Sequence, residues 1–91
     1  MYARVETFKV TPDDIDDVLA AQQHTVGLAR QLSGNMGGYV LVNRDACKVL
    51  SVSYWETDED RETAESEFQA APQRGEVELY AVAVQRSMSE T

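Results

Sequence analysis

The two side chains best suited to chemistry on a small molecule are Trp55 and His24, each the only residue of its type in the chain. An indole offers a broad flat surface on which an aromatic ligand can stack. An imidazole titrates near neutral pH, so it could remove the proton of a phenol. Residues 48 to 55 alternate in character as a strand does, which places Ser51 on the same face as Trp55. We therefore expect a cleft beside Trp55 that takes a small aromatic molecule.

Both residues also have a plainer interpretation. Large aromatic side chains commonly fill a protein core, and this alternative stays open for Trp55. A histidine on a helix beside Gln22 and Thr25 is commonly exposed or hydrogen-bonded to a neighbour. Arg4 and Glu6 lie two positions apart in a predicted strand. We expect this pair to meet its partners across a dimer or at its rim, because buried charges need partners.

Composition limits the classes of function. The 91 residues suffice for one small domain, which a partner subunit would help to stabilise. Eight Lys and Arg oppose sixteen Asp and Glu, and the net charge of -8 argues against binding to nucleic acid or to an anionic membrane. Cys47 is the only cysteine and has no cysteine or clustered histidine near it, so we expect no disulfide and no metal site. The charged start and the lack of a long apolar run predict a cytoplasmic protein.

Patterns along the chain predict six elements, in the order strand, helix, strand, strand, helix, strand. Thr11 and Pro12 begin the first helix, and Thr57 begins the second, with Asp60 three residues later completing a capping box. Pro72 ends the second helix. The predicted strands cover Tyr2 to Val10, Tyr39 to Asn43, Lys48 to Trp55 and Val77 to Arg86, and the predicted helices run from Thr11 to about Leu32 and from Thr57 to about Ala71.

This order of elements is that of the ferredoxin-like βαββαβ fold in the α+β class. Right-handed crossovers place both helices on one face of a four-stranded antiparallel sheet. We expect one domain over residues 1–86 and a flexible tail over residues 87–91. Gly34 should end the first helix in a left-handed conformation, and Gly37 and Gly38 should form a turn into the second strand.

The two faces of the sheet are expected to differ in the size of their side chains. A face of small side chains beneath the helices would leave space for a ligand beside Trp55. A bulky apolar face on the other side would pack on the same face of a second chain. We expect the small face to hold Ala3, Val5, Thr7, Ser51, Ser53, Trp55, Ala81 and Ala83, and the bulky face to hold Tyr2, Phe8, Leu50, Val52, Tyr54, Tyr80, Val82 and Val84.

The run Trp-Glu-Thr-Asp-Glu-Asp, residues 55 to 60, follows an apolar strand and resembles the antibiotic biosynthesis monooxygenase domain of the dimeric α+β barrel superfamily. The resemblance extends from Tyr2 to Arg86. It implies a homodimer that packs sheet on sheet, with substrates held between sheet and helices. Relatives in this family include cofactor-independent oxygenases of polycyclic phenols, haem-degrading enzymes and many members with no established activity.

Site residues can be compared with this family one at a time. Trp55 matches the family's cleft tryptophan, and Ser51 stands where the oxygenases have an asparagine, although a hydroxyl lacks the two donors of an amide. The haem-degrading branch has its iron-binding histidine on the second helix, whereas His24 is predicted on the first. The resemblance thus implies a cofactor-independent monooxygenase with His24 as base and with Trp55 and Ser51 positioning the ring. The alternative is a non-catalytic homodimeric module that binds a small ligand or has a structural role.

Overall fold

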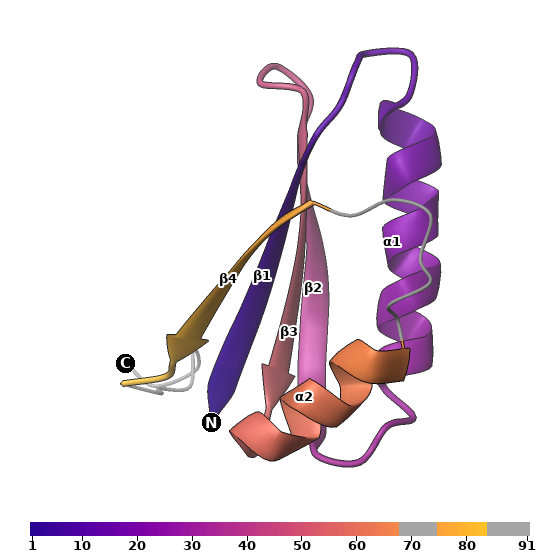
Figure 1. The fold of residues 1–91 in the computed structure, drawn as a ribbon. Helices are drawn as coiled ribbons and strands as arrows, with labels where there is room; N and C mark the ends of the chain where they lie inside the picture. The colour runs from indigo at the N-terminus through magenta and orange to yellow at the C-terminus, as the bar shows by residue number, and fades with distance from the viewer. Residues whose placement is uncertain (68–74, 84–91) are drawn as a thin grey trace, which may run out of the picture.

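A computed structural model describes residues 1–67 and 75–83 of the protein. These residues form six elements in the predicted order (Figure 1). The predicted tail over residues 87–91 and the predicted end of the second helix lie outside the described residues. The elements are β1 (Tyr2–Lys9), α1 (Ile15–Ala29), β2 (Asn35–Asn43), β3 (Lys48–Trp55), α2 (Asp58–Glu67) and β4 (Glu76–Ala81).

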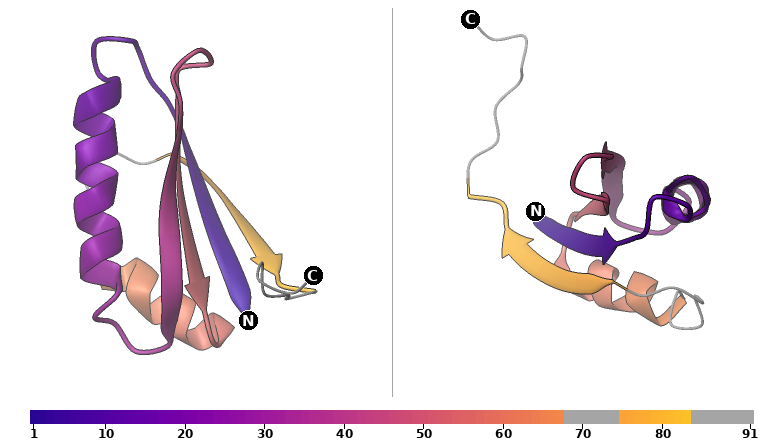
Figure 2. Two further views of the ribbon diagram at one scale, coloured as in Figure 1. Left: turned by 180° about the vertical axis from the view of Figure 1, so that it is seen from behind. Right: turned by 90° about the horizontal axis from the view of Figure 1, so that it is seen from above.

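The four strands form one antiparallel sheet in the order β2-β3-β1-β4, and both helices lie on the same side of it (Figures 1 and 2). The central strands β1 and β3 pair along their whole lengths, from Tyr2 opposite Trp55 to Lys9 opposite Lys48. The ferredoxin-like α+β fold predicted from the sequence is therefore confirmed. One face of the sheet is covered by helices, and we call the other the open face.

Packing of α1 on the sheet forms the larger apolar core. Ile15 and Val18 of α1 are buried against Phe8 of β1 and Val49 of β3. Val49 has no exposed surface at all. Gln22 is also buried, on the same side of α1 as Ile15, Val18 and Ala29. This core fixes which side of each central strand faces the helices.

The register corrects the predicted faces of β1. Phe8 lies opposite Val49, so this pair and every second residue from it point toward the helices. The prediction placed Tyr2 and Phe8 on the other face and was wrong, because an offset of one residue moves every side chain of a strand across the sheet. The predicted faces of β3 are confirmed. The open face carries Ala3, Val5, Thr7, Lys9, Tyr39, Leu41, Lys48, Leu50, Val52, Tyr54, Glu76, Glu78 and Tyr80.

The start of α1 differs from the predicted one. The helix begins at Ile15 after the cap residue Asp14, not at Thr11. The backbone carbonyl of Thr11 accepts a hydrogen bond from the Asp14 N–H at 3.0 Å, and the Thr11 hydroxyl donates to the Asp14 carboxylate at 3.0 Å. Thr11 therefore closes a turn before the helix instead of capping the helix itself.

The glycine predictions concern the end of the first helix and the start of the second strand. Gly34 has the predicted left-handed conformation, with a φ of +80°, but it does not stop the helix, because α1 ends at Ala29 with the right-handed cap residue Arg30. Gly37 and Gly38 were predicted as a turn, but they lie inside β2. The pairing of β2 with β3 shifts between Asn35 and Gly37, and Gly37 has a φ of +113°. The glycine thus accommodates a bulge that lets the strand start four residues earlier than predicted.

Candidate functional site

Trp55 lies at the junction of β3 and α2, as predicted, and it is buried. Its side chain is 2% exposed and packs with Ala29 of α1 and Ala64 of α2. The indole N–H donates a hydrogen bond to the Ser53 hydroxyl at 2.9 Å, so its one polar group has a partner within the chain. In the isolated chain Trp55 is therefore a core residue shared by both helices and the sheet.

The helix that follows Trp55 starts as the sequence predicts. The Thr57 side-chain oxygen accepts a hydrogen bond from the Asp60 N–H at 3.1 Å, which is the first half of the predicted capping box. Asp58, Glu59 and Asp60 fill the first turn, where acidic side chains favour the positive end of the helix dipole. This cap fixes the angle at which α2 leaves the strand and crosses over Trp55.

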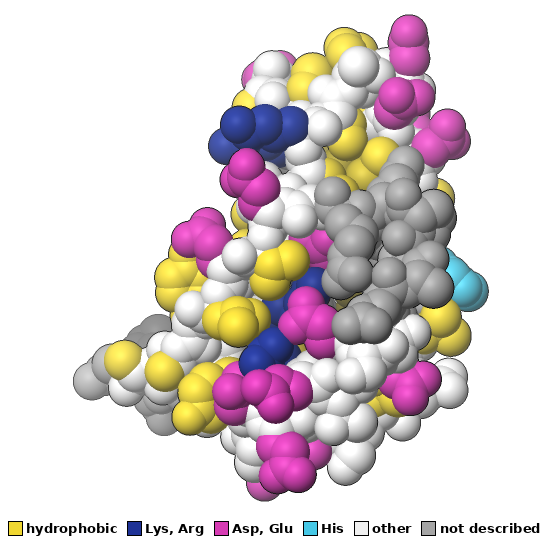
Figure 3. All heavy atoms as spheres, in the orientation of Figure 1, with side chains coloured by type: hydrophobic (Ala, Val, Ile, Leu, Met, Phe, Trp, Pro, Cys, Tyr) yellow, Lys and Arg dark blue, Asp and Glu magenta, His cyan; other side chains and the backbone are white. Residues whose placement is uncertain are grey.

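The structure brings two of the three predicted site residues to one face. Ser51 is buried, points to the helices like Trp55, and lies opposite Glu6 of β1. His24 lies on the exposed side of α1, and Figure 3 shows the histidine at the edge of the molecule. Gln22, two residues earlier, is the polar side chain of α1 that is buried against the sheet. The described chain thus places a hydroxyl and an indole beneath the helices and an imidazole outside them.

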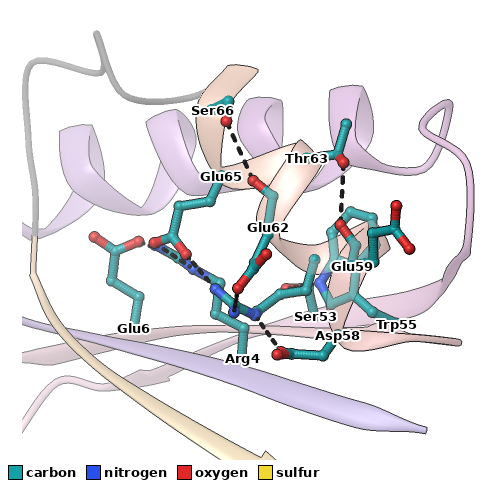
Figure 4. A network of polar contacts seen from close by, with 11 residues as sticks. Arg4, Glu6, Ser53, Trp55, Asp58, Glu59, Glu62, Thr63, Glu65 and Ser66 are labelled. Carbon is teal, nitrogen blue, oxygen red and sulfur yellow. Dashed lines mark hydrogen bonds and ion pairs between the residues drawn. The ribbon is translucent and has the colours of Figure 1, made fainter.

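An ion-pair network that the sequence analysis did not predict lies between the sheet and α2 (Figure 4). Arg4 on β1 donates to Glu6 at 2.9 Å and, through Nε and Nη2, to Glu65 of α2 at 3.2 and 3.0 Å. These contacts correct the prediction that Arg4 and Glu6 find partners across a dimer or at its rim. Both lie on the helix-covered face, and their partners belong to the same chain.

Arg61 extends this network along α2. It donates to Glu65 at 2.7 Å and to Asp58 at 2.9 Å, and it lies 3.5 Å from Glu62. Its side chain is only 9% exposed. The signal that could have revealed the network is Arg61 itself, the single cation of α2, placed three residues after one acid and four before another.

The far end of the network reaches the segment that leads into β4. The second oxygen of Glu6 accepts a hydrogen bond from the Gly75 N–H at 2.7 Å. A side chain at this position would collide with the backbone carbonyl of Thr7, so only glycine permits such a close approach. Glu6 therefore uses one oxygen to hold Arg4 and the other to anchor the backbone before β4.

Electrostatics keep this network ionised. Burial alone would raise the pKa of Glu65, but its hydrogen bonds and charge contacts with Arg4 and Arg61 outweigh burial and lower the pKa below the usual carboxyl range. The pKa of Arg61 is raised, chiefly by its hydrogen bond to Asp58. Carboxylates that already accept hydrogen bonds from guanidinium groups are weak proton acceptors. The network therefore suits attachment of α2 better than proton transfer.

Within residues 1–67 and 75–83, no group of three or more His, Cys, Asp and Glu side chains is arranged to hold a metal ion. In the same part of the chain, no helix is long and apolar enough to span a membrane.

Several solved structures have a fold similar to that of this chain. No family model and no curated protein matches the sequence. A Nitrosomonas europaea protein provisionally named an antibiotic biosynthesis monooxygenase matches with a TM-score of 0.74 and 15% identity, over 92% of this chain and 100% of that one. A heme-degrading protein of Mycobacterium tuberculosis matches with a TM-score of 0.75 and 14% identity, over 94% and 98%. A further antibiotic biosynthesis monooxygenase matches with a TM-score of 0.74 and 17% identity, over 92% and 100%.

These likenesses confirm the resemblance noted in the sequence at the level of the fold. They cover nearly the whole of each chain, so the shared feature is the complete ferredoxin-like domain and not a fragment of it.

Proposed function

Because the chain has the fold of solved structures named antibiotic biosynthesis monooxygenases, we propose that it is a homodimeric small-molecule monooxygenase that needs no bound cofactor. Its substrate class is a small aromatic compound with a phenol group, held between the sheet and the helices. The observation that supports this proposal is that Trp55 and Ser51 lie on the same face of the sheet, beneath the helices. An indole can stack on a ring, and a hydroxyl can hydrogen-bond to its oxygen.

The proposed reaction uses the substrate itself as the electron donor. Loss of a proton from an anthrone-like phenol gives an electron-rich carbanion, which reacts with O2 in a cleft that excludes water. The activated CH2 carbon gains one oxygen atom as a carbonyl, and the second oxygen leaves with the two hydrogens as water. His24 is the base proposed from the sequence. Since its side chain is exposed on α1, its role requires a test separate from that of Trp55.

Oxygen uptake tests this proposal directly. The purified protein is incubated with a panel of anthrone-like phenols while dissolved O2 is followed with an electrode. We expect uptake above the buffer rate, with a large loss in His24→Ala and none in Thr25→Ala, a matched change one residue along the same helix. Trp55→Phe should raise KM more than it lowers kcat, because a smaller ring stacks less well. An uptake rate equal to buffer with every substrate contradicts the monooxygenase.

A second candidate function, a non-catalytic module that binds a small apolar ligand or has a structural role, is favoured by two observations. Trp55 is 2% exposed, and the carboxylates near it are engaged by arginines. This candidate predicts that His24→Ala changes no property except stability. It also predicts that aromatic compounds quench the fluorescence of Trp55 without any uptake of O2. Turnover that disappears in His24→Ala would exclude this candidate.

The homodimer in this proposal is supported by the open face. Large apolar side chains stand exposed on it, including Tyr39 at 64%, Leu41 at 50% and Tyr80 at 49%. Tyr39 also packs edge-to-face against Tyr54, with ring centroids 6.4 Å apart, so the aromatic surface is continuous across β2 and β3. A contiguous apolar surface of this kind typically marks an interface between proteins. Light scattering after gel filtration should give twice the mass of the 10.1 kDa chain.

A further inference from the structure

The charges of the open face are separated into two groups around an apolar centre. Lys9 and Lys48 lie opposite each other at one end of the central strands. Glu76 and Glu78 lie along β4, one edge of the sheet, where they pair with Thr7 and Val5 of β1. The basic end and the acidic edge meet at one corner of the face. No ion pair joins the two groups within residues 1–67 and 75–83.

This separation restricts how two copies can pack face to face. When two copies pack face to face in a symmetric dimer, the twofold axis lies in the plane of the interface. If one residue contacts a second residue of the partner, then the second residue also contacts the first residue of the partner. An axis across the strands would stack β4 on β4 and place like charges together, which is unfavourable. An axis along the strands would stack β4 on β2 and place Glu78 against Tyr39 and Glu76 against Leu41. Both arrangements bury carboxylates without partners.

A diagonal axis resolves this conflict. Suppose that the axis runs diagonally through the corner shared by the acidic edge and the basic end. The acidic edge of each copy then lies over the basic end of the other copy. Strands lie about 4.8 Å apart, and residues about 3.3 Å apart along a strand. With these spacings, and measured in the plane of the interface, Glu76 of one copy lies within about 5 Å of Lys9 of the other, and Glu78 lies within about 5 Å of Lys48 of the other. The apolar centre stays covered, and the strands of the two sheets cross nearly at right angles.

We propose that Glu76 and Glu78 of each subunit pair with Lys9 and Lys48 of the other, and that these pairs set a crossed orientation of two sheets in the homodimer. The inference rests on the homodimer of the proposed function and adds the residues that orient it. Lys9, Glu76 and Glu78 are exposed in the single chain, so they are available to a partner. The Tyr80 hydroxyl donates to Glu78 at 2.6 Å and holds that carboxylate at the edge of the apolar centre.

Charge reversal tests this pairing. Variant K9E/K48E makes all four paired positions acidic, and variant E76K/E78K makes all four basic. Each variant alone should dimerise at least about tenfold more weakly than the natural chain, because every pair becomes repulsive. In an equimolar mixture every pair between the two variants is attractive again. The mixture should therefore form heterodimers with an affinity close to that of the natural dimer.

Sedimentation velocity over a concentration series measures these affinities. D13K/D17K is the control for E76K/E78K, because it makes the same change in net charge at two exposed acids away from the face. Variants that dimerise like the natural chain, or a mixture that stays monomeric, would overturn the proposed pairs while leaving the dimer intact. A natural chain that stays monomeric at high concentration would overturn the dimer and the pairs together. None of these outcomes depends on turnover, so a failed oxygen-uptake assay is a separate result.

Discussion

The two helices on the covered face of the sheet are attached by different kinds of interaction. α1 is held by an apolar core, in which Ile15 and Val18 pack on Phe8 and Val49. α2 has Ala64 as its one buried apolar side chain among the described residues. Its other strong contact with the sheet is the ion pair between Arg4 and Glu65. One helix is therefore attached by packing and the other largely by charge.

This difference determines how each helix responds to its surroundings. Apolar packing keeps its strength as pH changes, whereas an ion pair lasts only while both partners are charged. A helix with few buried apolar contacts also opens at a lower free energy than the global unfolding of the domain. We therefore expect α1 to unfold together with the sheet and α2 to separate from it first, uncovering Trp55.

The largest expected effect comes from removing part of the α1 core. Ile15→Ala should lower the free energy of unfolding by about 2–4 kcal/mol, because it leaves a cavity against buried neighbours. Leu28→Ala is the matched control on the same helix, and its exposed side chain should cost about 0.5 kcal/mol or less. Urea titration followed by circular dichroism measures both. Equal losses in the two variants would show that α1 is not held by this core.

A smaller effect is expected from breaking the attachment of α2. Arg4→Met should lower the free energy of unfolding by about 1–2 kcal/mol, because Glu6 and Glu65 each lose one of their two partners in a partly exposed site. Arg44→Met is the control, since its pair with Asp16 is exposed on both sides and should contribute about 0.5 kcal/mol or less.

Hydrogen exchange locates the effect of Arg4→Met within the chain. Amide exchange should accelerate in α2 more than in β1 and β3, because only the attachment of the helix is lost. A uniform acceleration across the whole domain would contradict separate opening of α2 and would point to a loss of global stability.

The smallest effect concerns pH. Since the folded-state pKa of Glu65 is lowered, its contribution to stability is fully present above the ordinary carboxyl pKa of about 4.3 and is lost as the pH falls through the lower folded value. The loss should stay below about 1 kcal/mol because this carboxylate is partly exposed. As the pH falls below about 4, the emission of Trp55 should shift to longer wavelength as α2 opens.

Glu65→Gln provides the comparison for the acid transition. Position 65 of this variant carries no charge at any pH, so α2 should be attached to the sheet less tightly even at neutral pH. The shift of Trp55 emission on acidification should therefore be smaller than in the natural chain. Identical transitions in the natural chain and in Glu65→Gln would show that other carboxylates control the attachment of α2.

Much of the fold could be predicted because its signals are local. Alternating side chains mark β3, and the cap at Thr57 marks α2. The face of β1 could not be assigned in this way. A strand pattern repeats every two residues, so it gives two sets of side chains without saying which set meets the helices. That choice depends on Phe8 meeting Val49 and α1, a contact between segments far apart in the sequence.

The site was harder to predict for the same reason. The position of Trp55 at the end of a strand followed from its neighbours in sequence, whereas its burial depends on Ala29 and Ala64 from two separate helices. Nothing in the sequence around Arg4 predicts its hydrogen bond to Glu65, which lies 61 residues later. Ion pairs between distant elements have no periodic pattern, so the partners of Arg4 and Glu6 were predicted to lie across a dimer or at its rim.

The acidic character of β4 has a consequence for solubility. β4 is an edge strand, and all six of its residues are exposed. An exposed edge with apolar residues such as Val77 and Leu79 offers unpaired backbone groups to any other extended chain and so invites aggregation. Glu76 and Glu78 place negative charges at two alternate positions of this edge. They repel a second copy that approaches edge to edge, and so protect the newly made chain from fibre-like association.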